Sequence, residues 1–332
     1  MSFGLVLTIF LVAGIGFLVF FIIKNIIVPR QAEIAGNSLD KKNILQAMRT
    51  AKAAIEKDPQ NAEAHYLLGK AYLADKREEL AFRSYRSANR LGIAGKNIPE
   101  TEFRETIAAL YTKFNEVEEA LKEYVLLIKQ HPENPDYYFR AGKIFSSRNR
   151  ADLAEQYLRK AVSLNPKGGN YRFELGMHYY SAKKMKEAVS ELEAAIRLDP
   201  TDNHAQLYMG KTLKDSKDYS GAITYLEKAS RDQEYKLRGL VELGSCYMSL
   251  KMMDKAVQEL ERAVAVIEKE ADPESLYARY FLAMCYENSR DITKALAQWD
   301  KIYAVKKNFR DVGEKLTQYI DHRLGTEDKP GK

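Results

Sequence analysis

Hydrophobic and polar positions divide the chain into a short apolar start and a long region with a helical period. Residues 1–23 contain no charged residue, and 18 of these 23 are hydrophobic, since the other 5 are Ser, Thr or Gly. From Lys24 onward, apolar residues recur every three or four positions, a spacing that places them on one face of an α-helix. The pattern predicts one apolar helix followed by many amphipathic helices.

The apolar start is long enough to cross a membrane. As a helix rising about 1.5 Å per residue it spans about 34 Å, and the hydrocarbon core of a bilayer is about 30 Å thick. A signal peptide needs a basic residue before its apolar run and a cleavage site of small residues after it, and neither is present. We therefore predict a retained transmembrane anchor over residues 1–28, with residues 1–23 in the membrane and Pro29 ending the helix.

The flanks of this segment predict its orientation. Lys24, Arg30, Lys41 and Lys42 follow the apolar run, whereas no Lys or Arg precedes it. Because basic flanks remain on the cytoplasmic side, we expect a single-pass protein of a cell inner membrane with its folded part in the cytoplasm. A periplasmic folded part is the alternative, since large domains do not always follow flank charge.

An internal repeat organises the remainder of the chain. Small residues preceded by an apolar residue recur at steps of 39, 34, 34, 34, 34 and 39 residues, obtained by subtracting consecutive positions. We call these positions the anchors: Gly69, Ala108, Gly142, Gly176, Gly210, Gly244 and Ala283. A small anchor lets two helices approach closely. Each period therefore predicts two antiparallel helices joined by a short polar turn, such as residues 147–150 or 181–184.

Two further columns accompany the anchors. An aromatic residue or leucine lies three positions after each anchor, as at Tyr72 and Phe145, and an alanine lies twelve positions after it, as at Ala81 and Ala154. Prolines close periods at Pro132, Pro166 and Pro200. This combination resembles the tetratricopeptide repeat (TPR) family. The resemblance implies an all-α, right-handed superhelical solenoid of antiparallel helix pairs.

The repeat and its ends predict the domain organisation. Residues 29–61 form a linker and a leading half-repeat, residues 62–308 form seven TPR repeats, and residues 309–332 form a capping helix over 309–324 followed by a disordered tail. The two 39-residue steps place insertions at residues 92–99 and 267–273. These insertions are either functional loops or simple tolerated connections.

Composition and motifs give little support for chemistry or nucleic-acid binding. The net charge is +6, but 52 basic and 46 acidic residues are interspersed, with no basic strip or base-reading motif. Phosphate-binding loops, zinc spacings and nucleophile elbows are missing, and the five histidines are scattered. Cys246 and Cys285 occupy equivalent repeat positions and are expected to be unpaired core residues. We expect no enzyme activity, no cofactor, no metal, no nucleic acid and no small-molecule substrate.

The resemblance also implies a working surface. In TPR proteins the first helices of successive repeats line a concave groove that binds protein segments. Carried over by repeat position, the groove residues are Tyr66, Lys70, Phe139, Lys143, Phe173, Met177, Tyr180, Leu207, Lys211, Lys214, Arg238, Tyr277, Tyr280 and Met284. Such a surface suits a peptide with apolar anchors and some acidic residues, although some of these aromatic rings could instead pack against neighbouring helices.

Two hypotheses about function remain open at this point. The first is a non-enzymatic, membrane-anchored scaffold or adaptor that recruits protein partners through the concave groove. The second is a regulatory or chaperone-like subunit of a membrane or envelope complex that acts in secretion, envelope biogenesis or flagellar assembly. The sequence does not distinguish between them.

Overall fold

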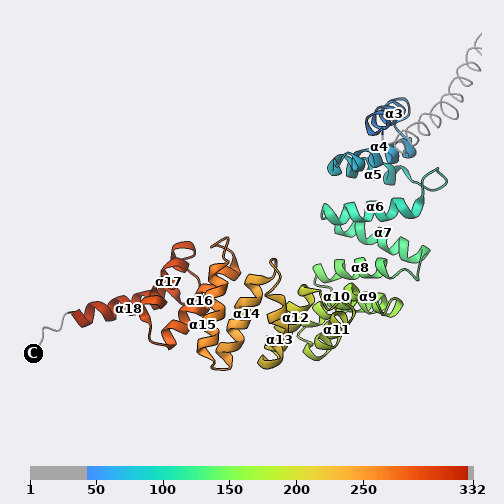
Figure 1. Ribbon diagram of the computed structural model, residues 1–332. Helices are drawn as coiled ribbons and strands as arrows, with labels where there is room; N and C mark the ends of the chain where they lie inside the picture. The colour runs from blue at the N-terminus through green and yellow to red at the C-terminus, as the bar shows by residue number, and fades with distance from the viewer. Residues whose placement is uncertain (1–42, 328–332) are drawn as a thin grey trace, which may run out of the picture. The chain divides into compact units, whose positions relative to one another are not determined.

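The computed structural model describes residues 43–327, and these residues form helices and connecting loops without a β-strand. Figure 1 shows the helices in chain order. Their bounds are α3 Ile44–Lys57, α4 Ala62–Ala74, α5 Glu78–Leu91, α6 Glu100–Lys113, α7 Val117–Gln130, α8 Pro135–Ser147, α9 Ala151–Leu164, α10 Gly169–Ser181, α11 Met185–Leu198, α12 Asn203–Asp215, α13 Tyr219–Ala229, α14 Lys236–Ser249, α15 Met253–Ala265, α16 Pro273–Asn288, α17 Ile292–Val305 and α18 Val312–Glu327. The predicted all-α class is confirmed for this part of the chain.

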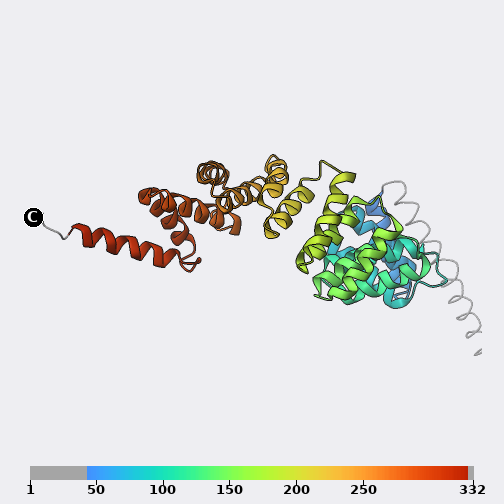
Figure 2. The same cartoon turned by 90° about the horizontal axis from the view of Figure 1, so that it is seen from below.

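The helices group into two compact units. The first unit ends at Ile144 and the second begins at Phe145, so that the division falls within α8. Inside each unit, neighbouring helices pack side by side, as α4 does with α5 and α10 with α11 (Figures 1 and 2). Each unit is therefore a stack of antiparallel helix pairs, in which the even-numbered helices from α4 to α16 are the first helices of the repeats.

The small anchors and the alanine column hold each pair together. A methyl group on Gly210 of α12 would lie 2.5 Å from Cγ of Leu226 in α13, which is too close for carbon atoms. A methyl group on Gly69 of α4 would likewise lie 2.6 Å from the ring of Tyr85 in α5. All seven alanines of the column are fully buried: Ala81, Ala120, Ala154, Ala188, Ala222, Ala256 and Ala295. The predicted close crossings are confirmed at these positions.

Each first helix ends in the same tight turn. The residue seven positions after the anchor has a positive φ, for example 60° at Lys183 and 68° at Lys217. The next backbone N–H donates to the carbonyl three positions after the anchor, so that Lys184 bonds Tyr179 O at 2.9 Å and Asp218 bonds Leu213 O at 2.9 Å. This arrangement satisfies helix-terminal carbonyls, and glycine adopts it with the least strain.

The described ends of the stack resemble the predicted ones. Helix α3 buries Ala47, Ala51 and Ala54 and packs on α4, as expected for a half-repeat. At the other end, Val312 and Leu316 of α18 are buried, and Tyr319 stacks on Trp299 at 5.8 Å.

The capping helix extends three residues beyond its predicted end. Helix α18 continues to Glu327 instead of ending at Leu324. A glycine inside a helix costs only about 1 kcal/mol, so Gly325 does not end the helix. Residues 328–332 lie outside the described part of the chain.

Both insertions pack against their own unit. Ile93 and Ile98 of the first insertion are buried. In the second insertion, the Glu270 carboxylate accepts two hydrogen bonds from the buried Arg279 guanidinium, at 2.7 and 2.5 Å. Arg279 also donates to Gln298 at 2.8 Å. These contacts support the structural interpretation of the longer connections.

Across residues 43–327, no helix combines the length and the apolar character that a membrane crossing requires. The predicted membrane-spanning segment, residues 1–23, and the linker up to residue 42 lie outside the described residues.

Candidate functional site

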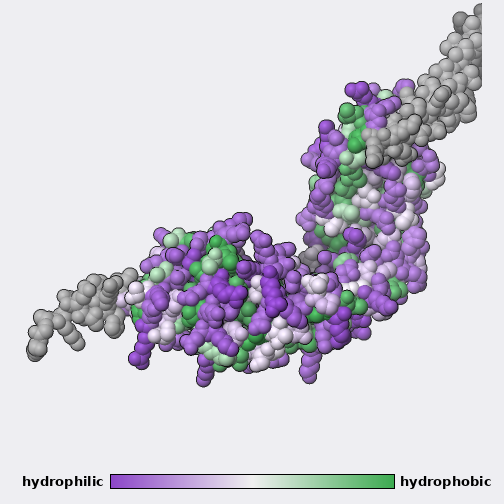
Figure 3. All heavy atoms as spheres, in the orientation of Figure 1, coloured by the Kyte–Doolittle hydropathy of each residue, from purple (hydrophilic) through white to green (hydrophobic). Residues whose placement is uncertain are grey.

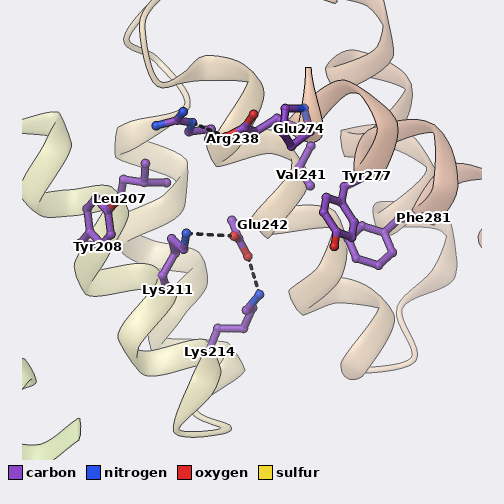
Figure 4. Close-up of a pocket in the computed structure, with 11 residues that line it drawn as sticks. Leu207, Tyr208, Lys211, Lys214, Arg238, Val241, Glu242, Glu274, Tyr277 and Phe281 are labelled. Atoms are coloured by element: carbon purple, nitrogen blue, oxygen red, sulfur yellow. Dashed lines mark hydrogen bonds and ion pairs between the residues drawn. The ribbon is translucent and has the colours of Figure 1, made fainter. Parts of the chain in front are cut away.

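The first helices of the last three repeats enclose a cavity in the second unit. Helix α14 contacts both α12 and α16, and the space among the three helices measures about 400 Å³. We call this space the first-helix cavity. It is lined by Leu207, Tyr208, Lys211, Lys214, Arg238, Val241, Glu242, Pro273, Glu274, Tyr277 and Phe281 (Figure 4).

Two lysines of α12 share one carboxylate of α14. Lys214 Nζ donates to Glu242 Oε2 at 2.5 Å, and Lys211 Nζ lies 3.8 Å from Glu242 Oε1. Figure 4 shows Glu242 between the two ammonium groups. Partial burial would lower the pKa of Lys214, but the adjacent Glu242 carboxylate outweighs it and raises this pKa above its usual value. Lys214 therefore stays protonated at neutral pH.

A second ion pair joins α14 to α16. Arg238 Nε lies 2.7 Å from Glu274 Oε1, and both side chains are partly exposed. The lining thus contains three cations and two carboxylates. The cavity carries one excess positive charge, which favours an anionic group in a ligand.

The remaining lining is apolar. Leu207 and Val241 are buried, and Tyr277 stacks on Phe281 with ring centroids 5.8 Å apart. In Figure 3, hydrophobic residues form patches within a mostly hydrophilic surface of each unit. A cavity with apolar walls and a few charged groups has the usual character of a ligand site.

An aromatic cluster borders the cavity on the α10 side. His204 lies 4.6 Å from Phe173, 5.1 Å from Tyr208 and 5.2 Å from Tyr235, measured between ring centroids. Tyr180 joins the cluster through Tyr208 at 6.0 Å. All five rings are partly exposed, so the cluster extends the apolar surface beyond the cavity.

Aromatic side chains also lie on the opposite side of the cavity. Tyr277 packs edge-on against Phe309 at 5.3 Å, and the Arg310 guanidinium lies 5.3 Å from the centre of the Tyr277 ring. Apolar and aromatic surface therefore lies on both sides of the charged centre.

The structure brings together many of the predicted groove residues. Leu207, Lys211, Lys214, Arg238 and Tyr277 line the first-helix cavity. Phe173 and Tyr180 belong to the aromatic cluster, and Met177 lines a neighbouring cavity of about 370 Å³ with Ser146 and His178. Met284 packs against the core of the last repeats.

Three predicted groove side chains are mostly inaccessible. Tyr66, Leu207 and Tyr280 are 3%, 1% and 6% exposed. Tyr66 packs against Tyr85 and Phe103, and Tyr280 packs against Phe309 and donates to Asp311 at 2.7 Å. Burial of Tyr66 and Tyr280 favours the alternative that these rings pack against neighbouring helices, whereas Leu207 forms part of the cavity wall. Their repeat position lies where one first helix meets the next, so neighbouring side chains cover it.

The other predicted groove residues lie in the first unit. Lys70 pairs with Glu102 at 3.1 Å and covers the Tyr66 ring at 5.5 Å. Lys143 lies 5.4 Å from the centre of the Phe139 ring, on the exposed side of α8.

Sequence reasoning missed Tyr208, Glu242, Glu274 and Phe281. Tyr208 and Phe281 lie directly after Leu207 and Tyr280, which were predicted. The exposed face of a helix spans about 100° or more, so residues adjacent to the expected stripe also reach the cavity. Counting acidic residues on the first helices would have identified Glu242 as a partner for the lysines.

The cysteines behave as expected for core residues. Cys246 and Cys285 are free and fully buried. Burial raises the pKa of Cys246 to about 12 and that of Cys285 to about 11. Within the described residues, no cluster of three or more potential metal ligands occurs.

Comparison with known proteins identifies the repeats. The tetratricopeptide repeat pattern matches residues 39–94, 107–169 and 140–203, and a second pattern of the same family matches residues 237–270. The chain belongs to the tetratricopeptide repeat family. These matches confirm the sequence-based resemblance. Members of the TPR family are protein-interaction scaffolds. No curated protein sequence matches the chain.

Solved structures of TPR proteins share this fold. The C-terminal part of a TPR protein from Cytophaga hutchinsonii is 19% identical, with a TM-score of 0.51, and the match covers 86% of this chain and 99% of that one. The APC/C hetero-tetramer Cut9-Hcn1 is 16% identical, with a TM-score of 0.55, and the match covers 83% of this chain and 52% of that one. At these identities the likeness concerns the fold alone.

Proposed function

We propose that this TPR protein is a non-catalytic scaffold that recruits a protein partner through the first helices of its second unit. The observation that carries the proposal is the first-helix cavity of about 400 Å³, in which partly exposed aromatic rings surround a charged centre. Aromatic side chains supply contact area at low entropic cost, and the two ion pairs fix the positions of the charges.

The proposal also includes a membrane anchor. Residues 1–23 are uncharged and are followed by Lys24 and Arg30, which supports a single-pass protein of a cell inner membrane with its repeats on the cytoplasmic side. Recruitment would then bring the partner to the membrane surface. A form of the protein found in the soluble fraction and beginning after Ile23 would contradict the anchor.

The groove is tested by removing two of its rings. We expect Tyr208→Ala combined with Tyr277→Ala to keep full helicity and to lose about thirtyfold in affinity for a partner captured by crosslinking, because truncating a binding hot spot costs at least about 2 kcal/mol. Tyr303→Ala is the matched control, since Tyr303 is 38% exposed on the second helix α17. Equal capture by the double variant and the wild type would overturn the proposed binding surface.

A further inference from the structure

The three cations of the first-helix cavity are not equally satisfied. Lys214 and Arg238 each have a carboxylate oxygen within hydrogen-bonding distance, at 2.5 and 2.7 Å. Lys211 Nζ is 3.8 Å from the nearest oxygen of Glu242, too far for a hydrogen bond. Glu242 is thus a close partner for Lys214 and only a distant one for Lys211.

Lys211 is also positioned to receive a ligand. Its side chain is 29% exposed, and its ammonium group lies 5.3 Å from the centre of the Tyr208 ring. In Figure 4 the ammonium end of Lys211 points into the cavity between Leu207 and Glu242. An ammonium group has three donors, so a ligand oxygen can bind while the contact with Glu242 remains.

We infer that the first-helix cavity binds a segment of a partner protein in which one Asp or Glu lies between apolar side chains, and that Lys211 receives this carboxylate. The inference rests on the proposed function and specifies its ligand. Charge complementarity supports this ligand, because the cavity has three cations and two carboxylates. The unequal pairing leaves the excess positive charge at Lys211.

The apolar surroundings define the neighbours of that acidic residue. On one side of Lys211, the apolar wall consists of Val241, Tyr277 and Phe281. On the other side lies the aromatic cluster, which includes Tyr208 and His204. A chain that contacts both sides places its carboxylate within the segment instead of at a chain end. A phosphoryl group is less suited to the site, because the Arg238 guanidinium is already engaged by Glu274.

The two neighbouring lysines then have different roles. Lys211 recognises the ligand, whereas Lys214 positions Glu242 and stabilises the contact between α12 and α14. Replacing Lys211 is expected to reduce binding without changing stability. Replacing Lys214 is expected to reduce stability.

Selection from a displayed library of random dodecapeptides on the purified full chain tests this inference. We expect the selected peptides to contain Asp or Glu flanked by aliphatic or aromatic residues, and Lys211→Glu to weaken a selected synthetic peptide by at least about tenfold. Lys211→Met, which keeps the length of the side chain, is expected to weaken it less. A new selection on Lys211→Glu should yield Lys or Arg in place of the acidic residue.

Lys228→Glu is the matched control. Lys228 lies on the second helix α13, with its ammonium 5.8 Å from the centre of the Tyr225 ring, and the substitution changes the net charge equally. Binding should be unchanged by it. An equal loss with Lys228→Glu would mean that only overall charge matters, and would overturn the role of Lys211.

Two other results separate this inference from the proposed function. Selected peptides that lack an acidic residue, but lose binding to Tyr208→Ala combined with Tyr277→Ala, would overturn carboxylate recognition and leave the binding surface intact. Selected peptides that bind this double variant as well as they bind the wild type would overturn both. Circular dichroism of each variant confirms that it is folded.

Discussion

The same repeat positions form a closed contact in the first unit and an open cavity in the second. Tyr66 and Leu207 each lie three residues before an anchor, Gly69 or Gly210. In the first unit, the Tyr66 hydroxyl donates to Glu102 at 3.2 Å, and its ring packs against Phe103. In the second unit, the smaller Leu207 contributes to the wall of the first-helix cavity.

The charges differ at corresponding positions as well. Lys70 and Lys211 both lie one residue after an anchor, and Glu102 and Arg238 both lie six residues before the next one. Lys70 therefore meets a carboxylate at 3.1 Å, whereas the residue corresponding to Glu102 in the second unit is a cation. A few side chains on a shared backbone thus decide whether the contact between successive first helices is closed or open to a ligand.

The largest expected effect removes the aromatic filling of the first unit. Phe103 is fully buried, and its ring lies 5.3 Å from that of Tyr85. We expect Phe103→Ala to lower the free energy of unfolding by about 3 to 5 kcal/mol, because the large cavity left behind cannot fully collapse. Urea denaturation followed by circular dichroism measures this change.

Phe281→Ala in the second unit is the control for that comparison. Phe281 is only partly buried and already lines a cavity, so its loss should cost about 1 to 2 kcal/mol. Equal costs for the two variants would refute the contrast between a filled and an open contact.

An intermediate effect is expected at Lys214. Lys214→Met leaves the partly buried Glu242 without its close partner and should cost about 1 to 2 kcal/mol at neutral pH. The pKa of Lys214 is raised in the folded state, so its stabilising contribution is complete below the unfolded pKa, near 10.5, and is lost as pH rises through the higher folded value. The difference between wild type and variant should therefore shrink above about pH 10.5.

Urea titrations of both proteins over a series of pH values provide this measurement. Lys228→Met, an exposed substitution on α13, should change stability by less than about 0.5 kcal/mol. A constant difference between wild type and Lys214→Met at all pH values would show that the Glu242 pair does not account for the effect.

The smallest effect concerns the turns that end the first helices. Lys217 of the second unit has a φ of 68°, which strains a residue with a Cβ atom, so Lys217→Gly should raise stability by about 0.5 to 1 kcal/mol. Asn115 is the corresponding residue of the first unit, with a φ of 59°. Asparagine tolerates this conformation better than lysine, so Asn115→Gly should gain less.

Thermal melting of these variants measures the difference. Lys228→Gly, inside α13, provides a control of opposite sign with a cost of about 1 kcal/mol. A loss of stability in Lys217→Gly would mean that the lysine side chain contributes more than the turn geometry costs.

Much of the fold follows from the sequence because the repeat makes local and long-range signals agree. The anchors and alanines predicted the helix pairs, since small side chains at fixed spacing are needed wherever two helices cross closely. The division into two units at Ile144 was not predicted, because the 34-residue period continues through it without a break. Periodicity therefore predicts the repeating element better than where one compact unit ends.

The site was predictable only in part. Repeat position assigned Lys211, Lys214 and Arg238 to first helices, and the structure places all three around one cavity. It did not predict which aromatic residues would be buried, because exposure of Tyr66 or Tyr280 depends on side chains of the following repeat and cap. The pairing of Lys214 instead of Lys211 with Glu242 depends on differences of about 1 Å that a periodic pattern does not contain.

The two buried cysteines give the second unit a property that the first lacks. Cys246 and Cys285 are the only cysteines of the chain, and both lie on first helices of the second unit. A thiol reagent needs access to a thiolate, and burial withholds both access and ionisation. The rate at which an unmodified chain incorporates such a reagent therefore measures how often its second unit opens, whatever the first unit does.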